Sequence, residues 1–101
     1  MALIASTKIC GATVTATDGT AIGTVTDFMV DHEAGGIAYA VVAHGGVLGV
    51  GEKLFAVPWH AFDVQPLDGA LRLDVSPDAL AAARGIDKDA WPAHSPEDWL
   101  A

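Results

Sequence analysis

The 101-residue sequence has one cysteine, only five Lys and Arg residues, and no long apolar run. Because Cys10 stands alone, no disulfide can form within the chain, and no Cys–His spacing typical of a zinc site occurs. A membrane helix needs roughly 20 consecutive apolar residues, and no segment approaches that length. The opening MALIAST lacks the charged n-region of a signal peptide. These absences predict a soluble, cytoplasmic protein.

The scarcity of positive charge also narrows the range of partners. Thirteen Asp and Glu residues against five Lys and Arg give a net charge of −8 at pH 7. Proteins hold nucleic acid largely by neutralising its phosphates, and an anionic membrane surface repels an acidic chain. We therefore expect neither nucleic acid binding nor direct lipid binding.

Turn signals are abundant, and they divide the chain into short β-strands. Asp18-Gly19 and Asp68-Gly69 are typical of tight hairpin turns, because both supply the positive-φ positions that such turns need. The apolar and β-branched segments between turn signals predict strands over 12–17, 21–31, 37–44, 54–59, 61–66 and 70–75.

Two of these segments have unusual patterns. Residues 37–44 are apolar on both faces, which predicts a central strand that is covered on each side. Residues 21–31 mix apolar and polar side chains on both faces and contain Gly23, which predicts a bend or bulge.

After residue 75 the period changes from strand to helix. Ser76 is a typical N-cap residue and Pro77 suits the first helical position, so a short helix is expected over 78–84, closed by Gly85. The tail beyond it has no periodicity and is expected along the surface. Together the segments predict a mainly β fold: a small, strongly bent antiparallel β-barrel of five or six strands with a short C-terminal helix. The expected domain covers 8–92, with a flexible tail over 93–101.

The stretch HGGVLGVGEK (44–53) holds four glycines and invites comparison with phosphate-binding loops. A P-loop needs Gly-Lys-Ser/Thr, but Glu52 separates the last glycine from Lys53, and Leu54 follows. The G-x-G-x-x-G pattern of dinucleotide sites is also missing. We interpret the loop as a connection between strands, with three apolar side chains available to contact a partner: Val47, Leu48 and Val50.

Candidate catalytic and metal-binding groups are sparse. The four histidines form no HxH, HxxxH or HExxH pair, and Asp31-His32-Glu33 is more typical of a solvated turn than of a metal site. Asp27 and Asp31 share one face of a strand, which usually marks its solvated side, and no Gly-x-Ser-x-Gly occurs. No catalytic residue, cofactor or metal is predicted, although spacing does not report on ligands that converge from distant segments.

The three tryptophans suggest another kind of site. Trp59 follows Pro58 at a strand end, where its ring could cap the barrel, whereas Trp91 and Trp99 lie in the aperiodic tail. An exposed tryptophan usually packs back on its own domain or docks on a partner. Both possibilities are open for the two tail residues.

Three segments, taken in order, resemble the PRC-barrel family. They are DGTAIGTVTDFMVD (18–31), IAYAVVAHGGVLGVGEKLFAVPW (37–59) and LDGALRLDVSPDAL (67–80). GIDKDAWP (85–92) is also similar to the tail of stand-alone members. This β-barrel occurs in the cytoplasmic part of the photosynthetic reaction-centre H subunit and at the C-terminus of a ribosome-maturation factor. The resemblance implies a docking and assembly module and no catalysis.

The leading hypothesis is a non-enzymatic interaction module that self-associates as a homodimer or larger assembly and docks on an unidentified protein. Its candidate interaction surface consists of Val47, Leu48, Val50, Trp59, Trp91 and Trp99. One alternative is a regulatory subunit on the cytoplasmic face of a membrane electron-transfer complex. Another is a small-molecule or metal binder that uses His44, His60 and Glu52 at the barrel mouth.

Overall fold

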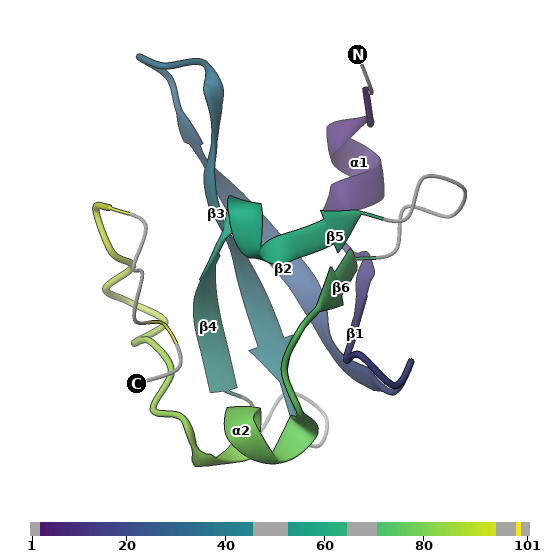
Figure 1. Cartoon of the computed structure of the whole chain (residues 1–101). Coiled ribbons are helices and arrows are strands. Elements are labelled where there is room, and N and C mark those ends of the chain that lie inside the picture. Colours follow the sequence, from purple (N-terminus) through teal and green to yellow (C-terminus); the bar gives the residue numbers. More distant parts are fainter. Residues whose placement is uncertain (1–2, 46–52, 65–70, 95–98, 100–101) are drawn as a thin grey trace.

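The fold is a single curled β-sheet flanked by two short helices (Figure 1). A computed structural model describes residues 3–45, 53–64, 71–94 and 99. The elements in chain order are α1 (Ser6–Ile9), β1 (Thr13–Thr15), β2 (Ala21–Asp31), β3 (Gly36–His44), β4 (Lys53–Pro58), the 3-10 turn η1 (Trp59–Ala61), β5 (Phe62–Val64), β6 (Leu71–Leu73) and α2 (Pro77–Ala82).

The six strands lie in the order β4-β3-β2-β1-β6-β5, so β4 and β5 form the two ends of the sheet. The chain passes from β4 to β5 through the three residues of η1 alone. This short link requires the two ends to lie close together, and the sheet therefore curls into a half-barrel. The predicted mainly β, strongly bent fold with a short C-terminal helix is confirmed.

One strand pair departs from the antiparallel pattern. β1 and β6 run parallel, with Val14 beside Leu71, whereas the other neighbouring strands are antiparallel. The alternation of apolar and polar residues in a strand carries no information about the direction of its neighbour. This pairing therefore could not be predicted from the sequence pattern.

The expected irregularity of 21–31 is confirmed in β2. Val25 pairs with Val42 and Asp27 with Val41, so the intervening Thr26 has no partner in the register and forms a bulge. The Thr26 hydroxyl donates a hydrogen bond to the carbonyl oxygen of Val41 at 3.2 Å. Because the extra residue reverses the alternation, Val25 and Phe28 both pack toward the main core.

The expected double covering of β3 is confirmed by two separate apolar clusters. Ala40 and Val42 belong to the main core inside the curl. Tyr39 and Val41 point to the opposite face and pack with Ala56 of β4 in a second cluster. The main core also contains Ile9, Val14, Val25, Phe55, Val57, Leu71, Leu73 and Leu80.

The helices have different origins in the sequence. The oxygen of the Ser76 side chain accepts a hydrogen bond from the Ala79 amide at 3.1 Å, so the predicted N-cap of α2 is confirmed. α2 ends at Ala82, and Gly85 follows with φ +79°. α1 was not predicted, because its four residues are too few to show a periodic pattern; it places Ile9 in the main core.

Candidate functional site

The candidate interaction surface divides into two parts. Val47, Leu48 and Val50, together with Glu52, lie outside the described residues. The three tryptophans are described, and each is partly buried against its own chain. Trp59 packs beside Phe62, with ring centroids 5.6 Å apart, and Trp99 meets Phe55 edge-on at 6.3 Å.

The third tryptophan belongs to a segment that we call the strap, residues 85–92. The strap starts where the Ile86 amide donates to the Leu54 carbonyl oxygen at 2.7 Å, forming an antiparallel bridge at the β4 edge. It ends where the Tyr39 hydroxyl donates to the Pro92 carbonyl oxygen at 2.6 Å. Between these points Trp91 covers the second cluster, formed by Tyr39, Val41 and Ala56.

The polar atoms under the strap are not all satisfied. The Nε1 atom of Trp91 is buried, and no hydrogen-bond partner for it lies among the described residues. Burial raises the pKa of the Tyr39 phenol above its ordinary value of 10.0, so this side chain remains a hydrogen-bond donor at neutral pH. The strap is thus held by defined hydrogen bonds at its two ends and by the packing of an indole whose N–H has no partner among the described residues.

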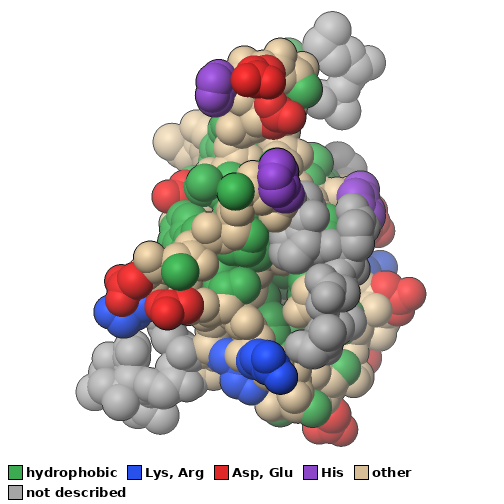
Figure 2. Space-filling model, turned by 90° about the vertical axis from the view of Figure 1, so that its left-hand side faces the viewer, with side chains coloured by type: hydrophobic (Ala, Val, Ile, Leu, Met, Phe, Trp, Pro, Cys, Tyr) green, Lys and Arg blue, Asp and Glu red, His purple; other side chains and the backbone are tan. Residues whose placement is uncertain are grey.

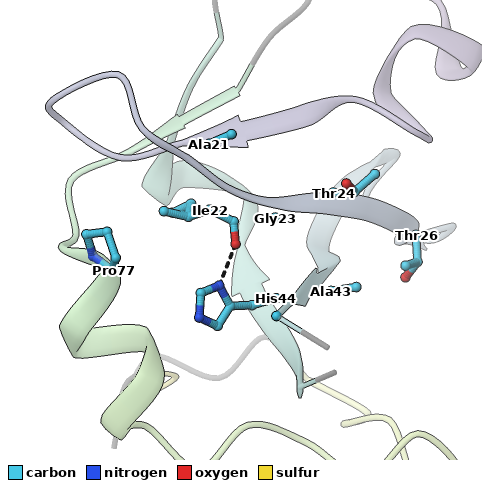
Figure 3. A pocket seen from close by; sticks show the side chains of 9 residues that line it. Ala21, Ile22, Gly23, Thr24, Thr26, Ala43, His44 and Pro77 are labelled. Atoms are coloured by element: carbon cyan, nitrogen blue, oxygen red, sulfur yellow. Dashed lines mark hydrogen bonds between the residues drawn. The ribbon is translucent and has the colours of Figure 1, made fainter. Parts of the chain in front are cut away.

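A small cleft opens at the other end of β3, between β2 and α2 (Figure 3). Its volume is about 470 Å³, and His44 and Pro77 lie on opposite sides of it. The His44 Nδ1 atom contacts the Ile22 carbonyl oxygen, which can only accept, so Nδ1 carries the proton. In the neutral ring Nε2 then offers an acceptor. The cleft is lined by Ala21, Ile22, Gly23, Thr24, Thr26, Ala43, His44, Gly45 and Pro77.

The other polar groups singled out in the sequence serve turns and main-chain contacts. An oxygen of Asp27 accepts a hydrogen bond from the Phe28 amide, and one of Asp31 accepts from the Glu33 and Ala34 amides. His60 lies in η1, at a distance in sequence from the His44 cleft. Within the described part of the chain, no three His, Cys, Asp or Glu side chains come together as metal ligands.

A surface on the hairpin of β2 and β3 was not predicted from the sequence. β1 pairs with β2 only as far as Thr24, and β4 pairs with β3 only from Tyr39 onward. Residues 27–37 therefore form a two-stranded arm that projects beyond the sheet (Figure 1). On this arm Met29 and Val30 are 38% and 55% exposed. The signal in the sequence was the run of three apolar residues, Phe28-Met29-Val30, between two aspartates.

The arm is also acidic. It carries Asp27, Asp31 and Glu33, and the sequence has no Lys or Arg between Ala21 and His44. On the face shown in Figure 2, acidic and histidine side chains cap the upper end, whereas Lys and Arg side chains lie in the lower half together with further acidic side chains. The arm therefore combines exposed apolar area with negative charge.

Comparisons with known proteins identify the family. No helix among the described residues is long and apolar enough to cross a membrane. The comparison with curated proteins gives no match. A family model, the PRC-barrel domain, matches residues 1–80, which is most of the sequence. The curled six-stranded sheet agrees with this assignment. The chain belongs to the PRC-barrel domain family.

Proposed function

We propose that this protein is a non-enzymatic interaction module that self-associates and docks on another protein. PRC-barrel domains are generally non-catalytic, and membership of the family supports an interaction role. The observation that carries the docking proposal is the exposed apolar pair of the arm, Met29 and Val30. Pairing with β3 holds both residues in a defined strand, so a partner meets a preformed surface.

The charge of the arm indicates what kind of partner it fits. Three acidic residues flank the apolar pair, and no Lys or Arg lies on the same hairpin. Two arms from two copies would place acidic side chains against acidic side chains, which disfavours that contact. The docking partner is therefore a different protein, with an apolar patch that is surrounded by Lys or Arg.

A crosslinked pull-down from the protein's own cells tests the docking proposal, with soluble and membrane fractions kept apart. We expect one dominant partner with the wild type and its loss with the double variant Met29→Ser, Val30→Ser. The matched control is Leu3→Ser, Ile4→Ser, which removes another exposed apolar pair. Retention of the same partner by the arm variant would contradict the proposal. Recovery only from the membrane fraction would favour a membrane-complex subunit.

Self-association is tested separately, by light scattering from micromolar to millimolar protein. We expect the mass to rise above that of one chain, 10.4 kDa, as the concentration increases. A constant mass of one chain over the whole range would contradict self-association and leave the docking proposal standing.

The His44 cleft favours a second candidate function, the binding of a small molecule. A thermal-shift screen checks this: a ligand at a hundred times its Kd stabilises the fold by roughly 2.7 kcal/mol. A hit that stabilises the wild type but not His44→Ala would support binding in the cleft. Equal shifts in both proteins would place the ligand elsewhere.

A further inference from the structure

The strap packs on the rest of the domain as a bound peptide would, although it belongs to the same chain. It lies beyond residues 1–80, the part of the chain that matches the family model. Among the described residues, each of its two ends is held by one hydrogen bond, to Leu54 and from Tyr39. Between these ends, Lys88 and Asp89 are about four-fifths exposed and pair only weakly with each other, at 3.6 Å.

The strap can pivot away from the rest of the domain at Gly85, and Trp99, which follows the strap in the chain, then leaves Phe55 as well. Immediately before the strap, the Lys53 ammonium donates hydrogen bonds to the carbonyl oxygens of Ala81 and Ala83, at 2.7 and 2.8 Å. These bonds fix the end of α2 to β4 independently of the strap. Gly85 then turns the chain with φ +79°, a conformation that glycine adopts readily. Rotation at Gly85 can therefore release the strap while α2 stays in place.

The face under the strap requires a cover. Tyr39, Val41 and Ala56 are each no more than 1% exposed with the strap in place. Release of the strap would open an apolar face beside the Leu54 carbonyl oxygen, which would lose its partner on the edge of β4. Such a surface favours an extended segment that offers an amide, a large apolar ring and a carbonyl oxygen in this order.

The structure itself shows one segment with the required fit, residues 85–92 of this chain. A second copy of the chain presents the same segment, and an exchange of segments between two copies reforms every contact that it breaks. The buried Nε1 atom of Trp91, without a partner among the described residues, lowers the cost of opening the strap, the step that must precede exchange. We propose that two copies exchange straps, so that the strap of each lies in the groove between Tyr39 and Leu54 of the other. This inference rests on the proposed self-association and names its surface.

The first test supplies the strap from outside. A labelled synthetic peptide, GIDKDAWPAH (residues 85–94), is titrated into the full chain, and its binding is followed by fluorescence anisotropy. We expect the Trp91→Ala chain, whose own strap is weakened, to bind the peptide about tenfold more tightly than the wild type. A peptide with Ala in place of the tryptophan should bind about tenfold more weakly, as expected when an aromatic anchor is removed. Equal binding of both peptides, or none at about 1 mM, would overturn the proposal.

The second test measures the assembly of the full chain by light scattering. Excess unlabelled peptide should convert wild-type dimer to monomer, whereas the peptide without tryptophan should not. The Lys88→Ala chain is the matched control, because this strap side chain is about four-fifths exposed, and it should dimerise like the wild type. Tyr39→Phe keeps the ring and removes the hydrogen bond to Pro92 from the closed and the exchanged forms alike, so it should leave the affinity of the dimer unchanged but speed its dissociation several-fold, even if Trp91→Ala does not fold.

The two proposals fail in different ways. A wild-type chain that stays monomeric up to about 1 mM, the effective concentration typical of a short tether, overturns both self-association and strap exchange. A dimer that resists excess peptide and whose dissociation rate is unchanged by Tyr39→Phe overturns only strap exchange, because self-association then uses another surface.

Discussion

At the scale of single residues, Tyr39 joins the central strand to the strap. It is the only tyrosine in the sequence, it is buried, and its hydroxyl donates to Pro92. The absorbance of phenolate therefore reports on this one contact without interference from another tyrosine. Ionisation of a single side chain thus measures how firmly the strap is held.

We expect the pKa of Tyr39 in the folded chain to lie above the ordinary value of 10.0, because burial disfavours the phenolate. Below that value the phenol is protonated in both folded and unfolded chains. Above it the unfolded chain releases the proton first, so the free energy of unfolding falls as pH rises toward the folded pKa. Absorbance titration gives the pKa, and denaturant unfolding at several pH values gives the slope.

Tyr39→Phe is the control for the slope. The part of the alkaline loss of stability that belongs to Tyr39 should be missing in this variant. Trp91→Ala should move the pKa back toward its ordinary value, because a loosened strap exposes the phenol. A wild-type midpoint at or below the ordinary value would contradict the prediction.

Gly23 is constrained by close approach rather than by its φ angle. A Cβ atom at this position would lie 2.5 Å from the carbonyl oxygen of Ala43 and 2.9 Å from a methyl carbon of Val42. The carbonyl belongs to the backbone of β3 and cannot move without disturbing the ladder. We expect Gly23→Ala to lower the free energy of unfolding by about 1–3 kcal/mol, the usual effect of overpacking. Denaturant unfolding measures the change.

Gly36 is the matched control for Gly23. It also lies in a strand of the same hairpin, but nothing lies within 4 Å of the position that its Cβ would take, and its φ is not positive. Gly36→Ala should therefore leave stability within about 0.5 kcal/mol of the wild type. Equal losses in the two variants would show that the approach of Gly23 to Ala43 is not what matters.

At the scale of elements, Lys53 connects β4 to α2. Its ammonium group supplies the hydrogen bonds that the last carbonyl groups of the helix lack, those of Ala81 and Ala83. We expect Lys53→Met, which keeps the aliphatic stem, to reduce the free energy of unfolding by about 1–2 kcal/mol. Lys88→Met is the control, because that ammonium is about four-fifths exposed. Similar losses in both variants would contradict the capping role.

Elements with a local signal were predictable from the sequence. Asp18-Gly19 forms its turn as expected, with Gly19 at φ +86° and the Asp18 carboxylate accepting from the Thr20 amide at 2.9 Å. β2 spans the predicted 21–31, and Leu71 and Leu73 face inward as their alternation with Arg72 indicated. In these cases the residues that define the element also make its decisive contacts.

Elements and sites that depend on distant partners were not predictable. The parallel pairing of β1 with β6 joins residues 14 and 71, and the strap meets Tyr39 across 53 positions of sequence. The Asp68-Gly69 turn and the glycine-loop residues Val47, Leu48 and Val50 lie outside the described residues, so those predictions stand untested. The exposure of Met29 and Val30 depends on where β1 and β4 stop, which no residue on the arm determines.

At the scale of the whole molecule, the uneven distribution of charge matters more than its sum. The net charge of −8 includes three acidic residues on an arm that has no Lys or Arg. A cationic partner is attracted to the arm over a distance set by the Debye length, which is about 10 Å at 0.1 M salt and about 3 Å at 1 M. The apolar pair Met29 and Val30 acts only on contact, and its contribution does not weaken with salt.

These two ranges give a prediction that separates charge from apolar contact. Once the docking partner is identified, its affinity for this protein should fall as the salt concentration rises from about 0.1 M to about 1 M. The fall should come mainly from slower association. The double variant Asp31→Asn, Glu33→Gln should flatten this dependence on salt, because it removes two negative charges from the arm. The turn itself should persist, because the substituted side chain at position 31 keeps an oxygen that can accept its hydrogen bonds. Met29→Ser, Val30→Ser should instead lower the affinity equally at every salt concentration.

Asp74→Asn, an exposed acid outside the arm, serves as the control and should change neither the affinity nor its dependence on salt. An affinity that depends equally on salt in the wild type and the Asp31, Glu33 variant would show that the partner senses the overall charge of the molecule and not the arm.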